Sequence, residues 1–375
     1  PTRRSSDLMS NVFDYLTWRN DLPFSVNPVN AVDSLIFSCL SYLRLQPAIQ
    51  KQSEISIRDA SAFFKLAKPE EIQYRVEEDM ELLHKMAEGS RFQDVLLCGY
   101  IDHLDASMEK QFSAVTCLLD DQLMLIAFRG TDNTLVGWKE DFNMTFMDTI
   151  PSQLEAVRYV EMMATAYPNH RIVLCGHSKG GNLAVYAGAC CSSSIQSRIQ
   201  TVYNHDGPGF NTAVLQGEGY RQIAGRIETF VPQSSVVGML LEHEEHYTVI
   251  SSNQISLWQH DPYSWEVLGA DFIRLDRVDK QSVILDAAIK QWISELDRSQ
   301  REAFIDAVFQ ILSNTNAASF KEMNENRMRS TALILKALNS TDKQTRKMLS
   351  DITFKLMASA KSAIEGNLSK DKSAK

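Results

Sequence analysis

The sequence predicts an α/β protein with a mostly parallel central sheet, followed by a C-terminal helical appendage. Two observations predict this class. Between about residues 111 and 251, short apolar segments alternate with helical segments, which is typical of a parallel sheet covered on both faces. From about residue 277 the strand-like segments stop and amphipathic helical segments continue. We therefore expect two domains, residues 1–276 and residues 277–375.

The composition is that of an ordinary soluble globular protein. Of the 375 residues, 44% are hydrophobic and 23% are charged, and no apolar run approaches the length of a membrane-spanning helix. Residues 1–8 lack the apolar segment of a signal peptide, so we interpret them as a non-native leader before Met9. None of the six cysteines forms a C-x-x-C pair, which favours buried thiols and a cytoplasmic location.

The formal net charge of -9 is unevenly distributed. Residues 315–375 contain 12 Lys and Arg but 6 Asp and Glu, so the rest of the chain is strongly acidic. An acidic body argues against nucleic acid as a partner. The basic C-terminal helix leaves a protein contact or a peripheral membrane contact open as alternatives.

The first segments are interpreted as helices that pack on the sheet. Apolar residues at helical spacing predict a helix within residues 30–43, and residues 54–90 also look helical, without any sign of chemistry. Two strands follow at residues 112–119 and 123–128. The second strand runs into Gly130-Thr131, where Thr131 is well placed to offer a donor to an oxyanion. Taken alone, this pattern more often marks a polar turn with a capping Thr.

Residues 171–190 carry the strongest functional signal. An apolar segment that suits a buried strand is followed by Gly176-His177-Ser178-Lys179-Gly180 and then by an Ala-rich helical segment. A G-x-S-x-G sequence between a strand and a helix is the nucleophile elbow of α/β-hydrolases. Ser178 is therefore the candidate nucleophile, and the backbone N–H of Lys179 is a candidate oxyanion donor. The alternative is a glycine-rich turn whose Ser only caps the helix.

Later strands bring further candidates to the same edge of the sheet. The strand at residues 199–204 is followed by Asp206, and the strand at residues 246–251 leads to His260. Loops at the carboxyl ends of parallel strands hold the site in such folds, and the order Ser, Asp, His is the one that α/β-hydrolases use. We expect an Asp206 oxygen to lie roughly 2.6–3.2 Å from His260 Nδ1.

Three other features are weighed against these assignments. His205 adjoins Asp206 and is a weaker candidate for the base. His243 and His246 flank two Glu residues, but H-E-x-x-H is not formed, so a solvated loop is favoured over a metal site. The apolar loop at residues 236–241 fits an acyl pocket or lid and ordinary core packing equally well.

The residues named so far resemble the lipase side of the α/β-hydrolases. Phe128-Arg-Gly-Thr131 and Gly176-His-Ser-Lys-Gly-Gly181 look like the oxyanion strand end and the elbow of class 3 lipases. The opening Asp14-Tyr-Leu-Thr-Trp-Arg19, the Asp206-Gly-Pro-Gly-Phe210 turn and the segment Gln259–Trp265 resemble the Mbeg-like family of bacterial hydrolase-fold proteins.

The resemblance has two departures. Class 3 lipases place their acid after the strand that follows the Gly-Pro turn, but this position reads Pro232-Gln-Ser-Ser235 and has no carboxylate. Asp206, one strand earlier, resembles the acid of the pancreatic lipase family instead. Lys179 also replaces an apolar residue or Gln, and its charge either favours an anionic substrate or is solvated.

These features predict a serine hydrolase of the esterase or lipase type that cleaves carboxylic esters, including lipid esters. The expected triad is Ser178, Asp206 and His260, with Thr131 and Lys179 at the oxyanion hole. The chemistry needs no cofactor and no metal. The alternative is a non-catalytic hydrolase-fold protein that binds a partner through its helical tail.

The tail is expected to form separate helices. Sequences that match capping boxes begin at Ser299 and Thr341. The predicted helices span residues 279–297, 300–313, 327–338 and 342–364, with a linker at residues 313–327.

Overall fold

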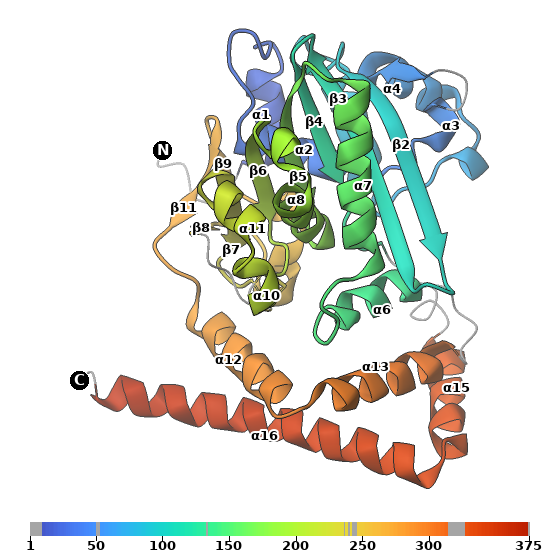
Figure 1. Cartoon of the computed structure of the whole chain (residues 1–375), viewed down its shortest axis with the longest axis vertical. Helices are drawn as coiled ribbons and strands as arrows, with labels where there is room; N and C mark the ends of the chain where they lie inside the picture. Colours follow the sequence, from blue (N-terminus) through green and yellow to red (C-terminus); the bar gives the residue numbers. More distant parts are fainter. Residues whose placement is uncertain are drawn as a thin grey trace, which may run out of the picture. The chain divides into compact units, whose positions relative to one another are not determined.

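A computed structural model describes residues 10–49, 53–132, 134–235, 237–238, 241, 246–313 and 327–373 (Figure 1). The chain divides into two compact units, one made of Pro1–His103, Phe112–Gly130 and Ser152–Val278, the other of Leu104–Gln111, Thr131–Pro151 and Asp279–Lys375. The division at Val278 lies next to the predicted boundary at residue 276. Two short segments of the predicted first domain belong to the second unit.

The described strands form one nine-stranded sheet in the order β1-β2-β3-β4-β5-β6-β7-β8-β11. Strands β4 to β8 pair in parallel, whereas β1 with β2, β3 with β4, and β8 with β11 pair antiparallel. The strands are β1 Glu54–Ser56, β2 Leu96–Asp105, β3 Lys110–Asp120, β4 Leu123–Phe128, β5 Arg171–His177, β6 Ile199–His205, β7 Ile227–Pro232, β8 Tyr247–Ile250 and β11 Arg274–Leu275. A separate hairpin joins β9 Val267–Leu268 to β10 Asp271–Phe272. The mostly parallel sheet predicted from the sequence is confirmed.

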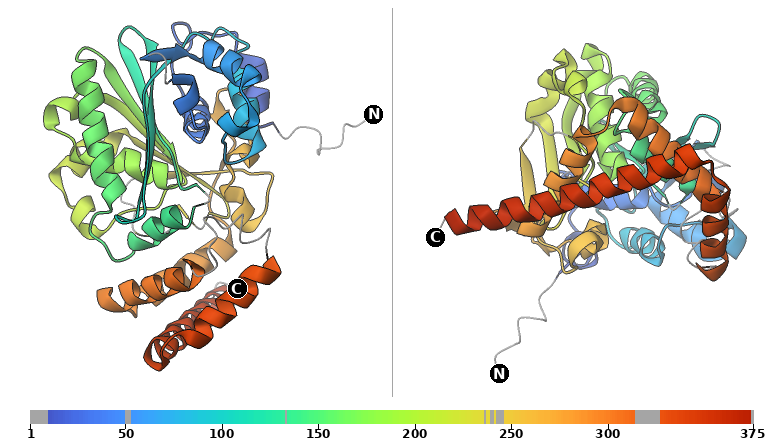
Figure 2. Two further views of the ribbon diagram at one scale, coloured as in Figure 1. Left: turned by 90° about the vertical axis from the view of Figure 1, so that its right-hand side faces the viewer. Right: turned by 90° about the horizontal axis from the view of Figure 1, so that it is seen from below.

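Helices cover both faces of this sheet (Figure 2). On β4, Leu125 and Ala127 belong to one buried cluster, while Met124 and Ile126 belong to the other, because successive side chains point to opposite faces. The first cluster includes residues of α1 Val12–Arg19, α2 Ala31–Leu40, α3 Gln46–Ile49, α4 Ile57–Leu66 and α5 Glu77–Met86. The second includes residues of α7 Pro151–Ala166, α8 Lys179–Cys190, α10 Thr212–Leu215 and α11 Glu218–Ile223.

Several local predictions need correction. Residues 54–90 are not all helical, since β1 pairs with β2 at the edge of the sheet, and neither strand was predicted. Strand β2 has mixed polarity and is only partly buried, so it lacks the apolar run that marks the central strands.

All six cysteines, each within the described part of the chain, are free thiols, and five of them are buried.

The second unit contains α6 Leu135–Asn143 together with the C-terminal helices. These are α12 Lys280–Ser294, α13 Arg298–Ser313, α15 Arg327–Ser340 and α16 Lys343–Ser373. Helix α12 packs along α16, where Trp292 Nε1 donates to the Ile352 carbonyl at 3.1 Å. Helix α13 packs on α6 through Phe309 and Phe142, whose ring centroids are 6.0 Å apart.

The predicted start residues of two tail helices are wrong by one or two positions. Helix α13 is capped by Asp297, whose carboxylate accepts from the Gln300 N–H at 2.9 Å. Helix α16 is capped by Asp342, which accepts from the N–H groups of Gln344 and Thr345. Asp satisfies the free N–H groups of a helix start as well as Ser or Thr does. Asp297 and Asp342 therefore cap the two helices in place of the predicted Ser299 and Thr341. Most of the predicted linker, residues 314–326, lies outside the described residues.

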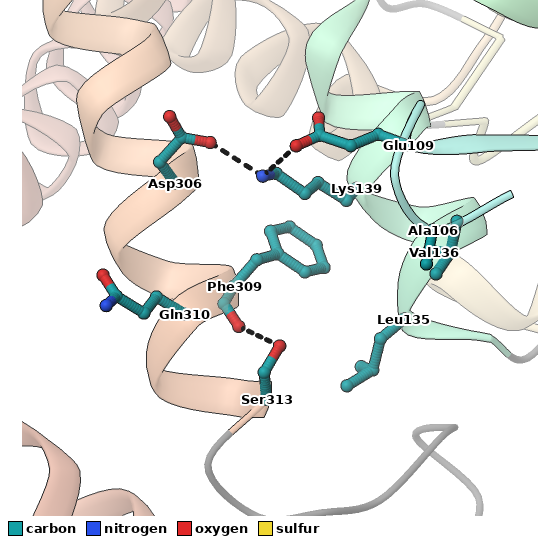
Figure 3. A pocket seen from close by; sticks show the side chains of 9 residues that line it. All are labelled: Ala106, Glu109, Leu135, Val136, Lys139, Asp306, Phe309, Gln310 and Ser313. Atoms are coloured by element: carbon teal, nitrogen blue, oxygen red, sulfur yellow. Dashed lines mark hydrogen bonds and ion pairs between the residues drawn. The ribbon is translucent and has the colours of Figure 1, made fainter.

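A cavity of about 490 Å³ lies within the second unit, between α6 and α13 (Figure 3). Lys139 Nζ extends between two carboxylates in its wall, at 2.5 Å from Glu109 Oε1 and 2.8 Å from Asp306 Oδ1. The other lining residues are Ala106, Leu135, Val136, Phe309, Gln310 and Ser313.

Among the described helices, none is both long enough and apolar enough to cross a membrane.

Candidate active site

Ser178 occupies a sharp turn between β5 and α8. Its φ of 59° and ψ of -134° place a non-glycine residue in a strained region, as expected where a surrounding structure over-determines the backbone. A Cβ on Gly176 would lie 2.1 Å from the Gly180 carbonyl, and a Cβ on Gly180 would lie 2.2 Å from the Phe128 carbonyl oxygen. Both flanking positions therefore require glycine, and the strand–turn–helix geometry is that of a nucleophile elbow.

Asp206 directly follows β6 and lies beside the elbow. His177 and His205 are register partners on β5 and β6, and the Ser178 N–H donates to the His205 carbonyl at 2.9 Å. Asp206 also has a positive φ, 53°, and its side chain is fully buried. The sheet register thus brings Ser178 and Asp206 to the same edge.

The predicted contact between Asp206 and His260 is present. His260 Nδ1 lies 2.6 Å from Asp206 Oδ2. The other carboxylate oxygen, Oδ1, accepts a hydrogen bond from Ser235 Oγ at 2.5 Å. A carboxylate only accepts, so His260 donates from Nδ1 and keeps Nε2 available as a base when the ring is neutral. The His260 side chain remains 29% exposed.

The segment that carries His260 is fixed by buried neighbours. His260 ends a 3₁₀ turn, Ser256–His260, and is followed by a second one, Pro262–Ser264. Trp265 is fully buried, and its Nε1 donates to the Gln259 carbonyl at 2.8 Å. Gln259 Oε1 in turn accepts from the Ser234 N–H at 2.6 Å. These bonds tie the histidine segment to the end of β7.

His177 packs against the His260 ring. Their ring centroids are 4.6 Å apart, and His177 Nε2 lies 2.9 Å from the His260 carbonyl oxygen. Burial lowers the pKa of His177 well below its usual value, so the ring is neutral. Its one proton must be on Nε2, because a carbonyl accepts, and Nδ1 therefore accepts from Tyr42 Oη at 3.0 Å. His177 thus packs on the His260 ring and donates to the His260 backbone carbonyl.

His205, the weaker candidate for the base, is excluded. Its ring is fully buried among Tyr203, Phe230 and Trp265, and Nε2 lies 2.8 Å from Ser34 Oγ. Burial lowers its pKa to about 3. A ring in this position belongs to the core and cannot reach a substrate.

The two candidate oxyanion residues have different surroundings. Lys179 begins α8, and its side chain is only 1% exposed, so the interpretation of its charge as solvated is wrong. Thr131 follows Gly130 and belongs to the second unit, where its hydroxyl donates to the carboxylate of Asp141. The hydroxyl proton of Thr131 is therefore engaged within the second unit.

Two other predictions fall on residues that the structure does not describe in full. In the apolar loop at 236–241, only residues 237, 238 and 241 are described. Of the four residues from His243 to His246, only His246 is described. No group of His, Cys, Asp and Glu residues suited to a metal ion occurs in the part of the chain that the structure describes.

Sequence reasoning missed two positioning residues. Ser235 holds the second oxygen of Asp206, and Tyr42 holds His177. A signal for Ser235 was present, since the segment Pro232-Gln-Ser-Ser235 ends and follows the strand that pairs with the Asp206 strand. The end of β7 supplies a hydroxyl that donates to the Asp206 carboxylate. Tyr42 lies far from the elbow in the sequence, and no local pattern marks it.

The central parallel strands, the strained elbow and the Asp–His pair at the carboxyl edge define a protein of the α/β-hydrolase class. Residues 86–310, more than half of the chain, match the Mbeg1-like family, and the chain belongs to this family. No curated protein matches the sequence.

Similar solved structures are fungal lipases. The chain is 17% identical to lipase II from Rhizopus niveus, covering 40% of this chain and 64% of that one, with a TM-score of 0.31. It is 16% identical to the lipase–propeptide complex from Rhizomucor miehei, covering 65% and 82%, with a TM-score of 0.36. It is 12% identical to a mutant of MDLA from Penicillium cyclopium, covering 74% and 89%, with a TM-score of 0.38. The chain thus spans less than two thirds of the Rhizopus lipase. Its fold class is assigned from the sheet topology and the elbow geometry.

Proposed function

We propose that this protein is a serine hydrolase that cleaves carboxylic esters through an acyl-enzyme. The observation that carries the proposal is the 2.6 Å contact between His260 Nδ1 and Asp206 Oδ2 beside a serine at a strained elbow. A catalytic histidine needs a buried acceptor that fixes its tautomer and stabilises the imidazolium. Asp206 meets this need, since it is fully buried and Ser235 restrains its other oxygen.

In the proposed reaction, His260 Nε2 takes the proton of Ser178 Oγ while Oγ attacks the ester carbonyl carbon. The carbonyl oxygen becomes an oxyanion, stabilised by the backbone N–H of Lys179 at the start of α8. Protonated His260 then gives its proton to the leaving alcohol as the ester C–O bond breaks. Water, deprotonated by His260, attacks the acyl-enzyme and releases the acid and Ser178.

The substrate class that we propose is a lipid-type ester. Ile255 and Trp258 are 75% and 73% exposed, and both lie within five residues of His260. Exposed bulky apolar side chains beside the base suit an acyl chain, whereas isolated ones elsewhere on a surface need no explanation. The resemblance of the Phe128–Thr131 and Gly176–Gly181 motifs to lipases supports the same class.

The decisive experiment is labelling of the full chain with a fluorophosphonate probe, with mass-spectrometric identification of the labelled residue. We expect a single adduct on Ser178, and we expect Ser178→Ala to abolish both labelling and hydrolysis of p-nitrophenyl acetate. The exposed Ser194→Ala variant is the matched control and should behave as wild type. A folded protein with no adduct, or full esterase activity in Ser178→Ala, would favour the non-catalytic alternative.

The lipid class has its own test. Trp258→Ala should lower kcat/KM for p-nitrophenyl octanoate several-fold and leave the value for the acetate ester unchanged, because only the longer chain needs an apolar surface. Equal effects on both esters would leave an esterase without the proposed chain preference. Leu66→Ala, which removes an apolar side chain that is 89% exposed on α4, is the control.

A further inference from the structure

The last two helices have a charge opposite in sign to that of the whole chain. From Arg329 to Met357 the sequence contains six Lys and Arg but two Asp, although the chain has a net charge of -9. Five of the six basic side chains are exposed: Arg329, Lys336, Lys343, Arg346 and Lys347. The sixth, Lys355, is half-buried against α12. Such segregation concentrates positive potential on α15 and the first half of α16.

Bulky apolar side chains are exposed among these charges. Phe354 is 72% exposed and Met357 is 66% exposed, whereas Ile352, on the side of α16 that packs on α12, is only 4% exposed. Lys347 precedes Phe354 by seven residues and Arg346 precedes Met357 by eleven, which is about two and three helical turns. The basic and apolar residues therefore share the outer face of α16. Leu335 on α15 is also 55% exposed, next to Lys336.

Two carboxylates offset only part of the charge of the six basic residues. The Asp342 carboxylate is engaged as the cap of α16, where it accepts from two backbone N–H groups and from Thr345 Oγ1. Asp351 is four residues after Lys347 and lies at the flank of the face. Between Lys343 and Ala360 the sequence has no other acidic residue.

We propose that the outer face of α15 and α16, defined by Arg329, Leu335, Lys336, Lys343, Arg346, Lys347, Phe354 and Met357, binds the surface of an anionic lipid bilayer. Basic residues are attracted to anionic head groups, and exposed Phe, Met and Leu side chains enter the boundary between head groups and acyl chains. A protein groove would instead require a continuous apolar stripe at i, i+3, i+4 and i+7, which basic residues interrupt here. Nucleic acid would use the charges but not Leu335 or Met357.

The test is sedimentation of the full-length protein with vesicles of phosphatidylcholine, with and without phosphatidylserine. We expect binding only when phosphatidylserine is present, and we expect salt to reverse it because the attraction is screened. Each basic residue near such a surface contributes about a five-fold factor in partitioning. Arg346→Glu with Lys347→Glu should therefore weaken binding by at least about 25-fold. Phe354→Ser with Met357→Ser should weaken it while leaving the salt dependence in place.

A matched control exists on the first unit. Lys65, Leu66 and Lys68 are also exposed, so Lys65→Glu with Lys68→Glu, and Leu66→Ser, make the same changes of charge and apolarity elsewhere. These variants should bind vesicles as wild type does, and all variants should keep the wild-type melting temperature. The proposal is overturned if the protein ignores anionic vesicles, if the control variants lose binding equally, or if it binds an acidic protein or nucleic acid through this face but not vesicles. None of these outcomes depends on whether Ser178 is a nucleophile.

Discussion

The two units differ in what fixes their important residues. In the first unit, Ser178 and Asp206 both have a positive φ, both are buried, and the Asp206 carboxylate has a partner for each oxygen. In the second unit, Lys139 is held by carboxylates that are themselves partly exposed, and the basic face of α16 is open to solvent. In the first unit, the backbone conformation fixes the positions of the candidate catalytic side chains. In the tail, the properties of the outer face follow from the types of residue that are exposed there.

The largest effect should come from Asp206→Asn. The amide keeps the shape of the side chain but cannot hold His260 in the same tautomer, and the same change in a serine protease lowers kcat by about 10⁴. We expect a loss of that order on p-nitrophenyl acetate with an unchanged melting temperature. Ser235→Ala leaves the carboxylate in place and should lower kcat far less. Equal kcat values for wild type and Asp206→Asn would remove Asp206 from the triad.

One core histidine of the first unit, His205, should make stability depend on pH. The unfolded chain protonates His205 below about pH 6.5, whereas burial lowers the folded-state pKa to about 3, so the unfolded state binds more protons between these values. Stability is therefore complete above pH 6.5 and falls as the pH drops towards 3. The loss due to His205 is about 2 kcal/mol at pH 5.

His205→Phe should remove this contribution. The ring fits among the aromatic neighbours, and Ser34 Oγ retains its bond to the Ala31 carbonyl at 2.8 Å. Urea unfolding at pH 7.5 and at pH 5 measures the difference. The variant should lose less stability than wild type between the two pH values, and an identical loss would show that His205 is not neutral in the core.

The ion pairs of the second unit should matter less (Figure 3). Burial lowers the pKa of Lys139, but the hydrogen bonds to Asp306 and Glu109 outweigh it and leave the pKa raised. Asp306 is 55% exposed, so we expect Asp306→Asn to lower the free energy of unfolding by about 0.5 kcal/mol or less. Glu302→Gln removes an exposed carboxylate from the same helix and should have no effect. A loss above 2 kcal/mol would contradict the view that this unit depends little on single contacts.

The smallest effect on the site should follow truncation after Ser313. The Ser178 elbow and the Asp206–His260 pair lie entirely within the first unit, so their labelling and hydrolysis rates should be close to those of the full chain. Helix α12 would lose its packing on α16, and we therefore expect a lower stability of the second unit alone. Loss of all soluble protein would show that the tail is needed for the core of the first unit.

The sequence predicted the central strands and the Asp206–His260 contact because their signals are local or topological. Apolar runs mark β4 to β7, and the carboxyl ends of parallel strands must meet at one edge. It did not predict β2, whose mixed polarity resembles that of a loop, nor Tyr42, whose role depends on the packing of α2 against β5. It also did not predict that residues 104–111 and 131–151 belong with the tail. Side-chain contacts such as that of Phe142 with Phe309 decide that grouping, and no spacing rule shows them.

This grouping has a consequence for the order of folding during synthesis. Arg301 donates to the Thr145 carbonyl across a separation of 156 residues, and Phe309 follows its partner Phe142 by 167 residues. At a translation rate of roughly 5–20 residues per second, α6 leaves the ribosome about 8–30 s before α13 exists. Throughout that interval Leu135 and Phe142 have no partner from the tail, so newly made chains should present an apolar segment that a chaperone can hold until translation ends.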